Sequence, residues 1–247
     1  MTHGDDDRTA AGGGGGGSHP SNGEPLLAAH GLVRTYGATE ALRGASVELR
    51  AGEIVAVTGP SGSGKSTLLH CLSGIVRPDA GSVTYAGERL EEATEERLST
   101  LRRTEFGVVF QFGQLIPELT ALDNVALPLM LGGATRVEAR EAADAWLERF
   151  GVRGQGDLRP GGMSGGQAQR AALARALVTG PKVVFADEPT GALDSLAAEQ
   201  VMTSLVGTAR EAGTAVLLVT HDARVAAYAD REVQLRDGAV VPLGVTA

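Results

Sequence analysis

The feature that most constrains this chain is a glycine- and serine-rich run that fits the pattern G-x-x-x-x-G-K-[ST]. Its residues are Gly59, Pro60, Ser61, Gly62, Ser63, Gly64, Lys65, Ser66 and Thr67. A short apolar run over residues 54–58 precedes it, as a buried strand would, and residues 67–72 continue as a helix that Gly74 ends. A strand that passes through glycines into a helix turns successive backbone N–H groups toward one point, where the helix N-terminus adds partial positive charge. The run therefore predicts a phosphate-binding loop and a bound nucleoside triphosphate.

Two side chains of this loop have specific expected roles. Lys65 would reach the β- and γ-phosphates, and Ser66 would ligate Mg²⁺. Gly62 and Gly64 would allow close backbone approach and unusual φ angles. The alternative interpretation is a Gly/Ser turn beside a surface lysine, and the strand and helix that flank the loop argue against it.

Composition narrows the choice of partners and compartment. The 247 residues allow one large domain or two small ones, and the net charge of −8 argues against nucleic acid or anionic lipid as the main partner. The single cysteine, Cys71, excludes a disulfide framework and a cysteine-based metal site. The N-terminus is acidic, and no apolar run approaches the 18 residues of a membrane span. We therefore expect a cytosolic protein.

The order of elements predicts an α/β fold. Residues 1–24 are of low complexity and are expected to form a disordered tail. Apolar runs between residues 25 and 49 and at 82–87 predict a small antiparallel sheet. Strands alternate with helices further on, which predicts a parallel sheet. A mostly helical insertion, placed at about residues 112–165, completes the expected architecture.

Three local elements are also expected. A helix should start at Thr135, where Glu138 completes a capping box, and Trp146 on its apolar face is expected in the core. An alanine-rich helix is expected from Ala168 to Val178, and a hairpin is expected to turn at Asp237-Gly238.

Polar residues stand where four predicted strands end. They are Thr58, Gln111, Asp187 with Glu188, and His221. Because the carboxyl ends of parallel strands meet at one edge, these side chains are expected at the same rim. Asp187 would hold Mg²⁺, Glu188 would act as general base on a water, Gln111 would ligate Mg²⁺ or orient that water, and His221 would donate to the γ-phosphate. A lone Gln or His at a strand end is more often structural than functional, and it is the ordered set after a phosphate loop that predicts hydrolysis.

A second anion-binding helix start lies more than a hundred residues after the start of the phosphate loop. The stretch Met163-Ser164-Gly165-Gly166-Gln167-Ala168-Gln169-Arg170 is similar to L-S-G-G-Q-x-Q-R, the signature of the nucleotide-binding domain of ATP-binding cassette (ABC) transporters. The resemblance covers residues 25–243 and implies an ABC ATPase fold that uses ATP and Mg²⁺. It also implies a homodimer on ATP binding, in which each ATP lies between one copy's phosphate loop and the other copy's Ser164, Gly165, Gly166 and Gln167. Met163 and Ala168 depart from the commonest residues of the signature, but both positions tolerate such a change in side-chain volume.

Other stretches extend the resemblance. Tyr36 is positioned like the aromatic residue that stacks on adenine, and the loop 192–194, which ends at Asp194, is similar to the one that communicates across the dimer. Residues 110–129 and 187–194 resemble the lipoprotein-release and macrolide-efflux branch. That branch implies an ATPase at the cytoplasmic face of the plasma membrane, acting on a separate integral-membrane permease in export. The permease contact is expected at residues 112–118, through an apolar cluster of Phe112, Leu115, Ile116 and Pro117.

Two other functional classes are considered. One is a non-transport regulator that signals through a membrane partner, like the cell-division relative of this branch, and the chain alone does not separate it from a transporter. The other is a DNA-repair or translation ABC ATPase. Gln111 and Ser164 are too close in sequence for an inserted coiled coil, no second cassette is present, and the acidic charge argues against nucleic acid.

Overall fold

The computed structural model describes residues 24–111 and 113–241, and its centre is a six-stranded sheet with the order β10-β9-β3-β8-β7-β6. Five of these strands run parallel, and β10 pairs antiparallel with β9. The strands are β3 (Ile54–Thr58), β6 (Phe106–Val109), β7 (Val183–Asp187), β8 (Ala215–Val219), β9 (Arg231–Arg236) and β10 (Ala239–Val241). The hairpin expected at Asp237-Gly238 and the parallel core are confirmed.

A second sheet is antiparallel, as expected, with the order β2-β1-β4-β5. Its strands are β1 (Leu27–Tyr36), β2 (Thr39–Leu49), β4 (Ala80–Tyr85) and β5 (Glu88–Arg89). The glycines between residues 25 and 49 suggest several short strands, but β1 and β2 are long and continuous. Gly44 lies inside β2 with φ +83°, next to a shift in register, so it marks an irregularity of the ladder and not a chain reversal.

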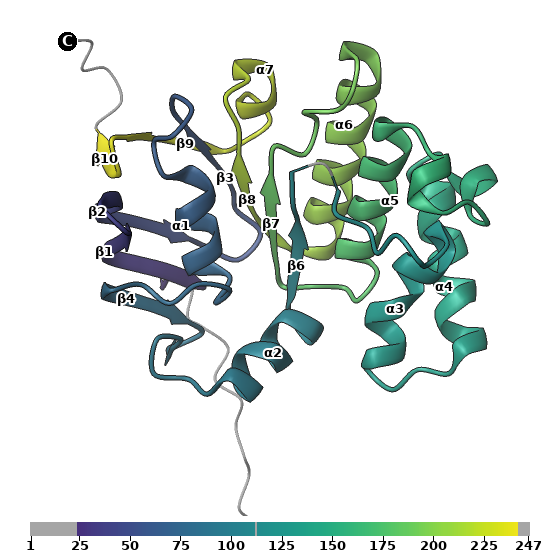
Figure 1. Ribbon diagram of the computed structural model, residues 1–247, viewed down its shortest axis with the longest axis horizontal. Helices are drawn as coiled ribbons and strands as arrows, with labels where there is room; N and C mark the ends of the chain where they lie inside the picture. Colours follow the sequence, from purple (N-terminus) through teal and green to yellow (C-terminus); the bar gives the residue numbers. More distant parts are fainter. Residues whose placement is uncertain (1–23, 112, 242–247) are drawn as a thin grey trace, which may run out of the picture.

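Helices cover both sides of the parallel sheet. In Figure 1, α1 lies between the two sheets, whereas α5 and α6 pack on the other side with α3 and α4 beyond them. The α-helices are α1 (Lys65–Leu72), α2 (Glu95–Thr104), α3 (Ala121–Leu131), α4 (Arg136–Arg149), α5 (Gly165–Leu177), α6 (Ser195–Ala212) and α7 (Ala223–Ala226), with short 3₁₀ turns at Arg153–Gln155 and Pro160–Gly162. No described helix is long and apolar enough to cross a bilayer.

Alternate residues of the central strands belong to different halves of the core. On β7, Val183 and Phe185 pack toward α1 and the antiparallel sheet, whereas Val184 and Ala186 pack toward α3, α5 and α6. All four side chains are fully buried. Continuous apolar strands of this kind require cover on both faces, which α1 on one side and α5 and α6 on the other provide.

Two expectations about helices need correction. The alanine-rich helix expected from Ala168 begins at Gly165, because Ser164 caps it with a reciprocal pair of hydrogen bonds to Gln167. The helix expected from Thr135 is confirmed with its capping box, but its buried positions are Ala139, Ala143 and Leu147. Trp146, expected in the core, is only half-buried, with the Arg149 guanidinium 5.5 Å from its ring centroid. The predicted disordered tail lies outside the described residues except for Glu24.

Candidate functional site

The phosphate loop joins β3 to α1, and its glycines are required by the fold itself. A Cβ at Gly59, where φ is +144°, would lie 2.0 Å from the carbonyl oxygen of Leu235 on β9. A Cβ at Gly64, where φ is +100°, would lie 2.3 Å from the carbonyl oxygen of Ala41 on β2. Real Cβ atoms do not approach backbone oxygen so closely, so both sheets shape the loop before any ligand binds.

Lys65 lies across the mouth of this loop. Its Nζ donates to the carbonyl oxygens of Gly59 at 2.9 Å and Pro60 at 2.8 Å, and the residue is buried. A buried ammonium that has only neutral carbonyl partners is well placed to exchange them for anionic oxygens.

One cleft gathers most of the residues that the sequence places at the strand ends. Its volume is about 440 Å³. It is lined by Ala41, Ser61, Gly62, Gly64, Lys65, Ser66, Thr67, Gln111, Asp187, Glu188 and His221. Phosphate-loop residues and the polar ends of three other strands therefore meet around one space, as the convergence of parallel strands requires. Ala41 was not expected there, because nothing in the sequence shows that β2 passes beside the phosphate loop.

Asp187 ends β7 and faces the start of α1. It is 5% exposed, and burial raises the pKa of its carboxyl above the ordinary value, against a hydrogen bond with Ser66 that lowers it. A buried carboxylate beside a hydroxyl supplies the hard oxygen ligands that Mg²⁺ prefers, and Mg²⁺ sites in nucleotide-binding proteins take further oxygens from phosphate and water. The described residues contain no cluster of three or more His, Cys, Asp or Glu side chains suited to a metal. Asp187 and Ser66 together offer two oxygen ligands, which fits Mg²⁺ that keeps phosphate and water oxygens as its other ligands.

Glu188 has a strained backbone in a fixed position. Its φ is +47°, in the left-handed region that few non-glycine residues adopt. Its N–H donates to the Val219 carbonyl oxygen at 2.9 Å, and its own carbonyl accepts from Gly191 N at 3.1 Å. Such strain persists only where surrounding contacts hold it, and it is frequent at functional sites.

The Glu188 carboxylate interacts with the residues that follow β8. Oε1 accepts from His221 N at 3.1 Å and lies 2.6 Å from His221 Nδ1, while Oε2 accepts from Thr220 Oγ1 at 3.2 Å. Because a carboxylate oxygen only accepts, the Nδ1 contact requires the proton on that ring nitrogen. The sequence predicts Glu188 and His221 in one site, and the geometry brings them into direct contact. Thr220 was missed, although a polar residue directly after an apolar strand and before His221 is a usable signal.

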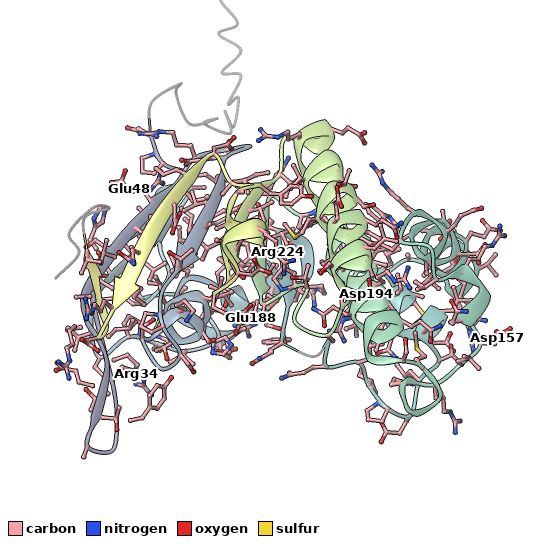
Figure 2. The ribbon with its side chains drawn as sticks, turned by 90° about the horizontal axis from the view of Figure 1, so that it is seen from above. Arg34, Glu48, Asp157, Glu188, Asp194 and Arg224 are labelled. Carbon is pink, nitrogen blue, oxygen red and sulfur yellow. The ribbon has the colours of Figure 1, made fainter. Side chains whose placement is uncertain are left out.

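Three expected site elements do not line the cleft. Tyr36, at the end of β1, is 46% exposed, with the Arg34 guanidinium 4.9 Å from its ring centroid. The Ser164–Gln167 segment starts α5, and Asp194 starts α6. Figure 2 labels Glu188 and Asp194 near the middle of the molecule and Arg34 on the side of the antiparallel sheet.

The start of α5 packs closely against the loop before α6. A Cβ at Gly166 would lie 2.7 Å from Leu193 Cδ2. Asp194 Oδ1 accepts from Ala197 N at 2.9 Å and so caps α6. Ser164 Oγ accepts from Gln167 N at 3.2 Å, while Gln167 Oε1 accepts from Ser164 N at 2.8 Å. Within one chain these residues therefore serve as helix caps and as a packed loop contact.

Comparison with known proteins gives the same assignment. A family model described as ABC transporter matches residues 42–191. The lipoprotein-releasing system ATP-binding protein LolD of Hyphomonas neptunium is 41% identical over 222 residues, which are 88% of this chain and 97% of that protein. The macrolide export ATP-binding/permease protein MacB 1 of Aeromonas hydrophila is 43% identical over 222 residues, which are 34% of its length.

Solved structures agree in fold. A dimeric structure of the ATP-binding cassette MJ0796 in a post-hydrolysis state, bound to ADP and Pi, matches with a TM-score of 0.85 at 36% identity. The match covers 88% of this chain and 97% of that one. With the phosphate loop, the cleft and the second anion-binding helix start in place, the chain belongs to the ABC transporter family as an ATP-binding, ATP-hydrolysing cassette.

Proposed function

We propose that the cleft binds ATP with Mg²⁺ and that two copies of this chain hydrolyse it head to tail. The observation that supports the proposal best is the gathering of Lys65, Gln111, Asp187, Glu188 and His221 around one cleft, while Ser164–Gln167 lies outside it. A second copy would supply that segment. In this proposal residues 25–247 form one nucleotide-binding domain, with a helical subdomain over about residues 112–165.

Binding would use the loop and its neighbours. Lys65 Nζ would exchange its two carbonyl partners for β- and γ-phosphate oxygens, and the backbone N–H groups of Gly59–Thr67 would surround the phosphates. Ser66 and Asp187 would hold Mg²⁺, which neutralises phosphate charge when bound. Tyr36 is exposed, as a ring that stacks on adenine must be.

Hydrolysis would depend on the strand ends. Glu188 would accept the proton of the attacking water, and Gln111 would orient that water or contact Mg²⁺. His221 has 72% of its side chain exposed, so its ring can leave Glu188 and donate to the γ-phosphate. The partner's Ser164–Gln167 helix start would add N–H donors, and Asp194 would contact the other copy.

Glu188→Gln tests the central assignment. The variant is expected to bind ATP as the parent does, to lose hydrolysis by 10²-fold or more, on the order of what a general base contributes, and to accumulate the ATP-bound dimer. ATP binding, phosphate release and size-exclusion chromatography with ATP measure these three properties. Hydrolysis by the variant at close to the parent rate would show that Glu188 is not the base.

The cassette would energise a separate permease in export, at the cytoplasmic face of the membrane. One relative is the ATP-binding protein of a lipoprotein-releasing system, and another joins an ATP-binding part to a permease for macrolide export. Both names support a permease partner and a lipid-linked or hydrophobic cargo. The permease that co-purifies with the chain distinguishes this role from a cell-division-type regulator, because the latter would bring a partner that acts on the cell wall.

The permease contact would lie at a groove of about 390 Å³ formed by β6, α2, α3 and α5. Phe110, Gln114 and Pro128 line it together with arginines of α2 and α5. Arg175 of α5 donates to the carbonyl oxygens of Gly113 and Gln114, both at 3.0 Å, and so joins the loop after Gln111 to the helix that Ser164 caps. A partner seated in this groove would contact both phosphate-sensing segments.

The expected apolar contact cluster needs revision. Leu115 is 9% exposed and belongs to the internal core, so it does not offer a surface to a permease. Ile116 is 37% exposed, and Pro117 is exposed as well. Phe112 lies outside the described residues. The contact proposed here therefore rests on Ile116, Pro117 and the groove.

A further inference from the structure

The orientation of the Glu188 carboxylate is set by a neighbouring strand and not by its own. Both carboxylate oxygens accept hydrogen bonds from the segment that follows β8, through Thr220 Oγ1, His221 N and His221 Nδ1. The His221 side chain is exposed, whereas Thr220 is fully buried. The Thr220 hydroxyl is therefore the most constrained side-chain partner of Glu188.

The direction of the hydrogen bonds at Thr220 is fixed. Asp222 N donates to Thr220 Oγ1 at 3.1 Å, so the hydroxyl accepts there and its single proton is left for Glu188 Oε2 at 3.2 Å. A hydroxyl held from both sides has one orientation. This orients Oε2 and ties the Glu188 side chain to the position of the Asp222 backbone.

Asp222 is in turn connected to the first residue of α6, directly after the loop 192–194. Its carboxylate accepts from Arg224 N at 2.8 Å and from Arg224 Nη2 at 2.7 Å. The other end of the same guanidinium, Nη1, donates to Ser195 Oγ at 3.3 Å. Ser195 directly follows Asp194, which ends the loop 192–194. Arg224 thus joins the segment that carries His221 to the segment that carries Asp194. Figure 2 labels Arg224 near Glu188 and Asp194.

A cavity lies next to the contact that Arg224 makes with Asp222 and Ser195. A space of about 400 Å³ is lined by the start of α6 and by α7, with Met202, Val225 and Tyr228 on its apolar side and Ser195, Asp222 and Arg224 among its polar lining. Where such a space lies between two elements, a side chain that bridges them transmits displacement that loose packing would absorb.

We infer that Thr220 is a positioning residue for Glu188, and that Asp222 and Arg224 extend this connection to Ser195, so that displacement of the loop 192–194 changes the orientation of the Glu188 carboxylate. The inference rests on the proposed role of Glu188. In each copy, a shift of the loop 192–194, which would face the partner, would thereby alter how Glu188 contacts the attacking water of the same copy.

The two halves of the connection differ in strength. Thr220 donates a buried hydrogen bond to a carboxylate. Loss of that hydrogen bond corresponds to a decrease in kcat of about 10- to 100-fold. The Arg224 side chain is 74% exposed, so its ion pair with Asp222 is screened by solvent. Loss of this ion pair corresponds to a decrease in kcat of only about two- to fivefold.

The first test compares Thr220→Val with Thr220→Ser in the full-length protein. Thr220→Val keeps the shape but removes the hydroxyl, and it is expected to lower kcat by about 10- to 100-fold while KM for ATP and ATP-induced dimerisation stay at parent values. Thr220→Ser restores the hydroxyl and is expected to recover most of kcat. A parent-like kcat for Thr220→Val, or a Ser variant as slow as the Val variant, would overturn the positioning role.

The second test is a double-mutant cycle with Arg224→Met, and Ser195→Ala serves as its matched partner. Each single change is expected to lower kcat by about two- to fivefold, and neither should lower it further when Thr220 is Val, because the connection is already broken. Decreases that multiply independently would show that Arg224 acts apart from Thr220.

If Glu188→Gln retains hydrolysis, the proposed function fails. If Glu188→Gln is inactive and Thr220→Val is not impaired, only the positioning inference fails.

Discussion

At the scale of single residues, a buried carboxylate in the cleft lowers the stability of the folded chain, and the proposed metal-binding role explains why it is there. Asp187 is a buried carboxylate with a raised pKa, so the folded protein holds the proton of this group more tightly than the unfolded chain does. Ionisation therefore disfavours the fold as the pH rises through the interval between the ordinary carboxyl pKa, about 4, and the raised value, and the cost persists at higher pH.

Removing this charge should stabilise the nucleotide-free protein. Asp187→Asn is expected to raise Tm at pH 7, and the gain should disappear below about pH 4, where the parent residue is protonated in both states. Thermal unfolding over a pH series measures the effect, and Glu199→Gln, which changes an exposed carboxylate, serves as control. With ATP and Mg²⁺ the order should reverse, because the amide is a weaker metal ligand. A lower Tm for the Asn variant at pH 7 without nucleotide would contradict the account.

At the scale of elements, the loop after Gln111 is held by the first turn of α3. The side chain of Asn124 is fully buried; its Oδ1 accepts from Ile116 N at 2.7 Å, and its Nδ2 donates to Ile116 O at 3.0 Å. Both backbone groups of Ile116 are therefore fixed by one buried amide. The exposed Ile116 side chain projects from a rigid position, which suits a surface that a partner recognises.

Ile116→Asp is expected to abolish co-purification with the permease while ATP binding and Tm stay near the parent values, because the side chain lies outside the core. Leu115→Asp is the contrasting variant. It places a charge in the core cluster and should lower Tm strongly. Affinity purification from membranes and thermal unfolding separate the two effects. An Ile116→Asp protein that still holds the permease would move the contact away from this loop.

The elements also show how far the sequence can be interpreted. Apolar runs located β3, β6, β7 and β8, because strands buried on both faces have no polar alternation. The strand β9 alternates in burial, and the turn at Asp237-Gly238 located it instead. The start of α5 was placed too late, because Gly165 and Gly166 are poor helix formers and only the Ser164–Gln167 caps extend the helix through them. Leu115 was assigned to the surface, because the sequence does not show which side of a loop faces the core.

Long-range contacts limit prediction of the site in the same way. The strand ends identified Asp187, Glu188 and His221, because parallel strands bring their carboxyl ends together. The left-handed backbone of Glu188, the hydrogen bond from Thr220 and the presence of Ala41 beside the cleft depend on how separate segments pack. Apart from the polar residue at position 220, local sequence carries no signal for such contacts.

At the scale of the whole molecule, Ser164 lies outside the cleft that contains the phosphate loop. Mixed dimers test whether a second copy supplies it. A mixed dimer that carries Lys65→Ala and Ser164→Arg on the same copy should lose activity at both sites, because each site takes one damaged segment. A mixed dimer with one change on each copy is the control, and it should keep one intact site and about half the activity. Differently tagged copies, purified as mixed pairs, allow both rates to be measured. Half the activity in the first pair would rule out the head-to-tail arrangement.

The position of β3 in the central sheet has a consequence for synthesis on the ribosome. This strand leads into the phosphate loop, yet its neighbours are β8 and β9, and Thr58 hydrogen-bonds to Glu232, which lies 174 positions later in the chain. The turn after β9 also contacts the loop directly, since Gly238 N donates to Ser63 O at 3.0 Å. A nascent chain therefore presents its glycine-rich segment early but lacks the strands that shape it until nearly all of the sequence has been translated. We therefore expect nucleotide capture to wait for translation of the last hairpin, so that an interrupted chain would not sequester ATP.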